Sequence, residues 1–167
     1  MKKLIILAGL PGSGKSTYVK KHYHDENSFH FDSDETRKSM YGTYLHFPKD
    51  MYEIYDHMID LANEQYDKLI KEGIEDFTFI MDSTFLDNKR RNHYLDRLRK
   101  FDKNIIIMFY TTDINWNLKN NKNRIKDKWV PEDVIFNMIK QYEPLDESTR
   151  KRFDEVVEVT MPEDKDK

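Results

Sequence analysis

The sequence lacks cysteine altogether, although it is 167 residues long. The chain therefore has no disulfide, no thiolate nucleophile and no cysteine-ligated zinc site. A long apolar run is also missing, because no segment approaches the ~20 apolar residues that a membrane-spanning helix needs. We therefore expect no membrane contact. The absence of cysteine fits a reducing compartment, and we expect a cytoplasmic protein.

A strong excess of charge of one sign is missing as well. Charged residues make up 35% of the chain and hydrophobic residues 38%, but the formal net charge is only −3. The protein is therefore not one of the strongly basic proteins that bind nucleic acid over their whole surface. Contact with nucleic acid requires a local basic patch. The length, with no repeat, linker or low-complexity segment, predicts one domain over residues 1–167. The sequence leaves the oligomeric state open.

The first ten residues, MKKLIILAGL, imitate the start of a signal peptide. The apolar run stops at Pro11-Gly12, and a Gly-Lys pair follows at Gly14-Lys15. Such a run is too short for an export segment. A continuous apolar run suits a strand that is buried on both faces of a parallel sheet, and we expect a first strand here.

Short apolar segments alternate with helical patterns along the chain. This alternation predicts an α/β fold of three layers with a parallel five-stranded sheet. We expect strands at residues 3–8, 28–31, 77–81, 104–110 and 155–160. Helices are expected at 15–23, 34–41, 48–71, 87–99 and 131–142, with Ser33 or Asp34 as the N-cap of the second. The tail, residues 161–167, is expected to fray.

A phosphate-binding loop follows the first predicted strand. The segment GLPGSGKST matches Gly-x4-Gly-Lys-[Ser/Thr] through Gly9, Gly14, Lys15 and Ser16. The glycines let the backbone turn so that several N–H groups point into one cavity and bind phosphate oxygens. The lysine reaches the β- and γ-phosphates, and the hydroxyl of Ser16 ligates Mg²⁺. We therefore expect ATP and Mg²⁺ as cofactors, with further phosphate contacts from Gly12, Ser13 and Thr17.

Such a loop serves switches, motors and kinases alike, so the rest of the chain must decide the function. The chain resembles the kinase domain of the phage-type 5′-polynucleotide kinases in four segments: LIILAGLPGSGKST (4–17), FDSDETRKSM (31–40), IMDSTFLDNKRRNHY (80–94) and residues 116–138. The resemblance implies a P-loop kinase with a basic lid. It also implies transfer of the γ-phosphate of ATP to a 5′-hydroxyl of DNA or RNA, in nucleic-acid repair. The family often carries a phosphatase domain beside the kinase, and we expect none in these 167 residues.

Asp34 and Arg37 carry the chemistry that an alcohol acceptor needs. A carboxylate can orient a hydroxyl and take its proton. Three residues further along a helix, Arg37 lies on the same face and can grip a phosphate with two parallel hydrogen bonds. The resemblance implies that Asp34 is the general base and that Arg37 holds the phosphate just 3′ of the acceptor nucleotide. The alternative is a helix-cap aspartate paired with an arginine of its own helix.

Asp82 ends the apolar segment FTFIMD. A carboxylate at this place can hold Mg²⁺ through water or order the acceptor site. The family has an important acid at the matching position, so the resemblance adds Asp82 to the catalytic residues without fixing its role. The alternative is an N-cap for the following turn.

A basic stretch between residues 118 and 130 is predicted to form the lid. It contains five basic residues and one acid, a local charge of 5 − 1 = +4. Kinases close such a lid over the donor, and an arginine from it neutralises charge on the transferring phosphate. The resemblance points to Arg124 as that arginine. The chain departs from the family at Asn120-Asn121, where Arg-Asn is usual, and the alternative is a solvated lysine-rich loop.

Two further groups of residues are weaker candidates. Lys89, Arg90 and Arg91 either meet a nucleic-acid backbone or form a plain exposed face. Tyr41, Tyr44 and Phe47 can stack on an acceptor base, although aromatics at such a junction more often belong to the core. Two other functions stay open. One is a kinase of a nucleoside, nucleotide or other small alcohol, and the second is an ATP-binding switch module, which the acid-arginine pair disfavours.

Overall fold

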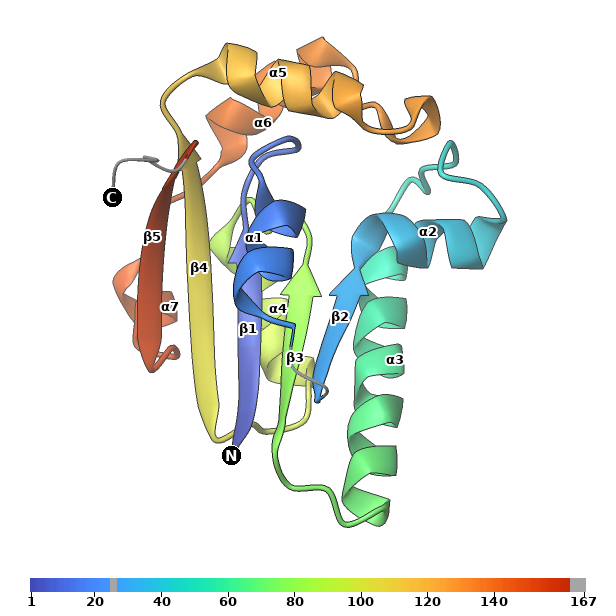
Figure 1. Ribbon diagram of the computed structural model, residues 1–167, viewed down its shortest axis with the longest axis vertical. Coiled ribbons are helices and arrows are strands. Elements are labelled where there is room, and N and C mark those ends of the chain that lie inside the picture. Colours follow the sequence, from blue (N-terminus) through green and yellow to red (C-terminus); the bar gives the residue numbers. More distant parts are fainter. Residues whose placement is uncertain (25–26, 163–167) are drawn as a thin grey trace.

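A five-stranded sheet forms the centre of the molecule (Figure 1). The computed structural model describes residues 1–24 and 27–162. Every pair of neighbouring strands is parallel, and the order is β2-β3-β1-β4-β5. The strands are β1 (Lys2–Ala8), β2 (Ser28–Asp32), β3 (Phe77–Asp82), β4 (Lys103–Thr111) and β5 (Glu155–Met161). The three-layer α/β fold with a parallel five-stranded sheet is thereby confirmed.

Helices cover both faces of this sheet. In chain order, the helices of the described residues are α1 (Lys15–His22), α2 (Ser33–Tyr41), α3 (Tyr52–Lys71), α4 (Asn88–Arg97), α5 (Ile114–Asn123), a 3₁₀ turn η1 (Lys126–Lys128), α6 (Glu132–Gln141) and α7 (Glu147–Arg150), of which α5 and α6 lie across one edge of the sheet. Successive side chains of β1 alternate between two buried clusters. Leu4 and Ile6 pack with residues of α3 and α4, whereas Ile5 and Leu7 pack with Val19 of α1. The apolar run of β1 is therefore explained by burial on both faces.

The junction between β2 and α2 differs from the expectation. The N-cap of α2 is Asp32, whose Oδ1 accepts hydrogen bonds from the backbone N–H groups of Asp34 (2.7 Å) and Glu35 (3.1 Å). The predicted caps, Ser33 and Asp34, lie inside the first turn, because β2 continues one residue further than expected. Because Asp32 serves as the cap, the carboxylate of Asp34 is left available for other partners.

Two helices occupy stretches that the sequence did not mark. The start of the predicted lid belongs to α5, whose N-cap Asp113 accepts a hydrogen bond from the N–H of Asn115 (3.0 Å). A short helix, α7, is capped in the same way by Asp146. At α3 the expectation was too long, since the regular helix begins at Tyr52 and residues 49–51 form a bend and a turn.

The chain end is more ordered than expected as far as residue 162. Met161, predicted to fray, is the last residue of β5 and only 6% exposed, because it packs against the cluster around Phe109. The rest of the predicted frayed tail, residues 163–167, lies outside the described residues. In the part of the chain that the structure describes, no helix is both long and apolar enough to span a membrane.

Arg91 is a structural residue and not the nucleic-acid contact that was considered for it. Its side chain is fully buried, and it donates to the carbonyls of Phe85 (2.9 Å) and Glu143 (2.8 Å) and to Oδ1 of Asn88 (2.9 Å). These bonds join α4 to the loop before it and to the segment after α6. The sequence analysis expected Arg91 either at a nucleic-acid backbone or on an exposed face. Both expectations were wrong, because the sequence does not show the carbonyl partners that hold Arg91 inside the protein.

We predict that Arg91→Ala lowers the free energy of unfolding by about 3 kcal/mol or more, because it leaves three buried acceptors without a donor. Urea unfolding measures this change. The matched control is Lys89→Ala, at an exposed neighbouring position, where the change is expected to stay within about 0.5 kcal/mol. Equal stability of the two variants would contradict the structural role of Arg91.

Candidate active site

A cavity of about 1000 Å³ lies at the carboxyl ends of the central strands. Its wall combines the loop between β1 and α1, the start of α2, the end of β3 and the segment from α5 to α6. In Figure 1, α5 and α6 lie across this edge of the sheet, above α1 and β1. Ligands of open α/β sheets bind outside the carboxyl ends of the strands. The cavity therefore has the place and the size of a ligand site.

The phosphate-binding loop requires glycine at defined positions. Gly12 and Gly14 have positive φ angles of 73° and 85°. A Cβ added at Gly12 would lie 2.3 Å from the carbonyl oxygen of Asn117, and one at Gly9 would lie 2.7 Å from Oγ of Ser13. The N-cap of α1 is Gly14, so no side chain caps the first turn, which also contains no acid. Its N–H groups are thus available to phosphate oxygens.

Lys15 is held in place at the bottom of the cavity. Its Nζ donates to the carbonyls of Gly9 and Ser83, both at 2.9 Å, and lies 3.8 Å from Oδ1 of Asp82. Burial lowers the pKa of Lys15, while attraction from Asp82, Asp34 and Asp32 works in the opposite direction. The ammonium group is therefore fixed between the ends of β1 and β3. The carbonyl of Ser83 was missed as a partner because backbone groups leave no sequence signal.

Three side chains form a group in which a cation could be held. Asp32 and Asp82 lie opposite one another at the ends of β2 and β3, and ligand atoms of these two and His30 all lie within 4.8 Å of one another. Burial, with the charges of Asp82 and Asp34, raises the pKa of Asp32. Ser16 also lines the cavity. Carboxylate and hydroxyl oxygens are the ligands that Mg²⁺ prefers, so Asp32, Asp82 and Ser16 fit that ion, whereas the imidazole nitrogen of His30 does not.

His30 was not expected near the site. Its Nε2 lies 2.9 Å from Oδ2 of Asp82. Burial opposes a charged imidazole, but the hydrogen bond and the charge of Asp82 outweigh it and raise the pKa of His30. Asp32 was likewise missed as a site residue. The signal for both is the position at the carboxyl end of β2, where the predicted strand, residues 28–31, included His30 but stopped one residue before Asp32.

Asp34 lies between two arginines. Its Oδ1 accepts a hydrogen bond from Nη1 of Arg37 (3.1 Å), and its Oδ2 accepts one from Nη2 of Arg124. The Arg37 side chain is 5% exposed and also donates from Nε to the carbonyl of Tyr44 (3.0 Å). Phe47 lies over its guanidinium, 4.1 Å from ring centroid to Cζ. The structure thus brings Asp34, Arg37 and Arg124 together at the cavity that Lys15 also lines.

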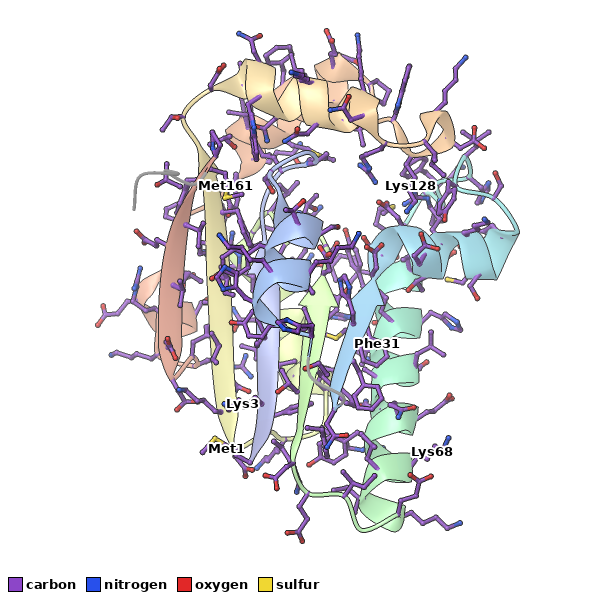
Figure 2. The ribbon with its side chains drawn as sticks, in the orientation of Figure 1. Met1, Lys3, Phe31, Lys68, Lys128 and Met161 are labelled. Carbon is purple, nitrogen blue, oxygen red and sulfur yellow. The ribbon has the colours of Figure 1, made fainter. Side chains whose placement is uncertain are left out.

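The predicted lid, residues 118–130, is attached at both of its sides. On one side, Nδ2 of Asn120 donates to the carbonyl of Gly12 in the loop between β1 and α1 (3.0 Å). On the other side, Nζ of Lys128 lies 2.7 Å from Oε1 of Glu35, on the first turn of α2. Figure 2 shows Lys128 above α2 and Met161 near the end of β5. The lid therefore bridges the phosphate loop and α2, with Arg124 between the two contacts.

Of the aromatic and basic residues that were weaker candidates for the site, some line the cavity and others do not. Tyr44 is buried and donates to Glu35 (2.7 Å), and Tyr41 donates to Glu53 (3.0 Å), so both have structural partners. Phe47 is 58% exposed and lines the cavity. Of the three neighbouring basic residues of α4, Arg90 lines the cavity and exposed Lys89 does not.

We predict that Gly12→Ala weakens ATP binding at least ~10-fold, because positive φ is strained for alanine and the new Cβ would meet the backbone of Asn117. Isothermal titration with ATP measures the affinity. Gly42→Ala is the matched control, since Gly42 also has positive φ but nothing within 4 Å of the added Cβ. A loop that tolerated Gly12→Ala with normal ATP affinity would contradict the tight geometry described above.

We predict that Glu35→Gln opens the lid, because it removes the charged partner of Lys128 and leaves the trypsin sites of the lid unchanged. Cleavage by trypsin within residues 119–128 should become several-fold faster, while Glu53→Gln should cleave like the unmodified chain. Hydrogen bonds from Lys128 and Tyr44 lower the pKa of Glu35. The contact is therefore present at neutral pH and is lost as the pH falls through that lowered pKa. An unchanged cleavage rate would show that this contact does not hold the lid.

Comparison with known proteins places this site in a family. Residues 4–145 match the model of the AAA_33 family, described as an AAA domain. An L-seryl-tRNA(Sec) kinase from Methanococcus maripaludis is 30% identical over 148 residues, which are 84% of this chain and 52% of that relative. The chain thus spans about half the length of this curated relative.

Two solved structures share the fold. A chain of the Pnkp1/Rnl/Hen1 RNA repair complex has a TM-score of 0.62 at 20% identity, over 92% of this chain and 46% of that one. Chaetomium thermophilum Kti12 in complex with ADP-AlF3 has a TM-score of 0.59 at 14% identity, over 98% of this chain and 92% of Kti12. At these identities the similarity shows the fold alone. Because the family model covers most of its length, the chain belongs to the AAA_33 family, and it is built as a P-loop kinase.

Proposed function

We propose that this chain transfers the γ-phosphate of ATP to the 5′-hydroxyl of a polynucleotide end. One observation carries the proposal. The carboxylate of Asp34 lies at the same cavity as the phosphate loop, between an arginine of its own helix and an arginine of the lid. A P-loop switch needs no such carboxylate facing its phosphates, whereas transfer to an alcohol does.

The donor half of the cavity suits Mg·ATP. The N–H groups of the loop and the Lys15 ammonium meet the phosphates. The family supports ATP binding, and Kti12, which shares the fold, is described with ADP-AlF3. Ser16, Asp32 and Asp82 would hold Mg²⁺, either directly or through water. When bound, the ion neutralises charge on the β- and γ-phosphate oxygens.

In the acceptor half, Asp34 accepts the proton of the attacking hydroxyl. The hydroxyl oxygen forms a bond to the γ-phosphorus, and the bond from that phosphorus to the β–γ bridging oxygen breaks, so ADP leaves with the electron pair. Arg37 binds the phosphate next to the acceptor nucleotide. Arg124 contacts Asp34 in the present structure, and it must exchange that carboxylate for the transferring phosphate to stabilise its charge.

A nucleic-acid acceptor is supported by the buried, anchored guanidinium of Arg37 and by the relatives. The curated relative is named as a tRNA kinase, and one structure with this fold belongs to an RNA repair complex. On the same grounds we propose a place in nucleic-acid repair. The second candidate is a kinase of a small alcohol, which the Lys128–Glu35 contact favours because it closes one side of the cavity.

One labelling experiment separates the candidates. The protein is incubated with γ-labelled ATP and Mg²⁺, and with 5′-hydroxyl DNA, 5′-hydroxyl RNA, nucleosides or 3′-mononucleotides as acceptor. Label at the 5′ end of an oligonucleotide supports the proposal and shows whether DNA or RNA is preferred. Label only on a nucleoside or another small alcohol selects the second candidate, and hydrolysis without any labelled acceptor selects the switch module.

We predict that Asp34→Asn lowers the turnover number by roughly 10²- to 10⁴-fold, the contribution expected of a general base. ATP affinity should stay within about twofold, because Asp34 lies on the acceptor side. Asp133→Asn, at an exposed position that does not line the cavity, is the matched control and should keep full turnover. Near-normal turnover of Asp34→Asn would show that the base is another group.

A further inference from the structure

The first turn of α4 places one basic side chain in the acceptor half of the cavity. Arg90 lines the cavity with Met51, Tyr55 and Leu86. Its neighbours in the sequence do not, since Arg91 is buried in structural hydrogen bonds and Lys89 is exposed outside the cavity. The function proposed above gives Arg90 no role, although it adds a cation to the acceptor half.

Arg90 is fixed in position by Asp87. Nη1 donates to Oδ2 of Asp87 (2.7 Å), and the backbone N–H of Arg90 donates to Oδ1 of the same carboxylate (2.8 Å). The side chain is 23% exposed, so most of it lies against protein. This anchor reduces the number of conformations that a ligand would have to select, which favours binding.

Part of the guanidinium has no partner in the protein. Within residues 1–24 and 27–162, Nε of Arg90 is buried without a hydrogen-bond partner. A guanidinium carries five N–H donors in a fork, and two adjacent donors match two oxygens of a phosphate. Nη1 donates to Asp87, and the Tyr55 hydroxyl is a second hydrogen-bond partner of the guanidinium. The N–H donors that these two partners leave are the ones that can meet a phosphate. An ion pair with Asp87 alone would not require the Arg90 side chain to line the cavity.

Arg37 and Arg90 approach the cavity from neighbouring elements. Helix α2 follows β2 and α4 follows β3, and these two strands are adjacent in the sheet. The same wall includes the apolar or aromatic side chains of Phe47, Met51 and Tyr55. The acceptor half therefore combines an apolar surface, which suits a sugar and base, with two guanidinium groups, which suit phosphates.

We propose that Arg90 binds a second phosphate of the acceptor strand, one nucleotide further from the reacting end than the phosphate held by Arg37. This inference rests on the proposed function and narrows it: the preferred acceptor is a single strand with at least two phosphates. Arg90 then contacts only acceptors that are long enough to carry a second phosphate. The two arginines together therefore favour binding of a polynucleotide over a mononucleotide.

The test compares two acceptors that differ by one nucleotide and one phosphate. The first is a nucleoside 3′-phosphate and the second is a dinucleotide that ends in a 3′-phosphate, both with a free 5′-hydroxyl. We expect Arg90→Gln to raise the KM for the dinucleotide roughly tenfold to hundredfold, the loss expected for one charge-assisted phosphate contact. The KM values for the mononucleotide and for ATP should stay within about twofold.

Arg97→Gln is the matched control. Arg97 is exposed on the same helix, two turns beyond Arg90 and about 10 Å away along the axis, and it does not line the cavity. All its KM values should equal those of the unmodified chain. Arg90→Lys keeps the charge without the planar fork, and its dinucleotide KM should lie between those of the unmodified chain and Arg90→Gln. A thermal melt of each variant verifies folding.

The outcomes separate the inference from the function on which it rests. An unchanged dinucleotide KM in Arg90→Gln overturns the inference, and so does an equal loss with both acceptors and ATP, which marks a structural role. If the unmodified chain labels neither acceptor, the proposed function fails. Arg90 is then tested by fluorescence anisotropy with a labelled dinucleotide 3′-phosphate, where an equal Kd for Arg90→Gln and the unmodified chain overturns the inference as well.

Discussion

The contact of Asp34 with two arginines is the interaction on which the site depends. Arg37 belongs to the same helix and is buried, so it fixes where the carboxylate lies. Arg124 comes from the segment after α5, ninety positions away in the chain, so it couples the lid to the acceptor side. In the account proposed here, catalysis begins when Arg124 exchanges this carboxylate for phosphate.

The lid joins the two halves of the cavity physically. Asn120 contacts the loop that faces the donor, and Lys128 contacts the helix that carries the proposed base. Asn120 stands where the family that the sequence resembles usually has arginine, and its amide instead donates to a loop carbonyl. Both contacts are made by polar side chains near the surface, which stabilise weakly and are easily exchanged. A lid of this kind can close and open during a turnover.

The sequence predicted the elements whose signal is local. Continuous apolar runs identified the strands, and the glycine pattern identified the phosphate loop because only glycine fits its positive φ angles. Residues that depend on distant partners were harder to assign. Arg91 and Arg90 look alike in the sequence, but Arg91 is buried and donates to the carbonyl of Glu143, 52 positions away, whereas Arg90 lines the cavity. Asp32 was missed because one residue at the end of β2 decides whether it caps α2.

The most direct test of this account is a crystal structure with a non-hydrolysable ATP analogue, Mg²⁺ and a 5′-hydroxyl oligonucleotide. The account predicts that Arg124 leaves Asp34 and contacts the γ-phosphate, and that the freed Asp34 oxygen lies within hydrogen-bond distance of the 5′-hydroxyl. An Arg124 that stays on Asp34 with both ligands bound, or a 5′-hydroxyl out of reach of Asp34, would contradict it.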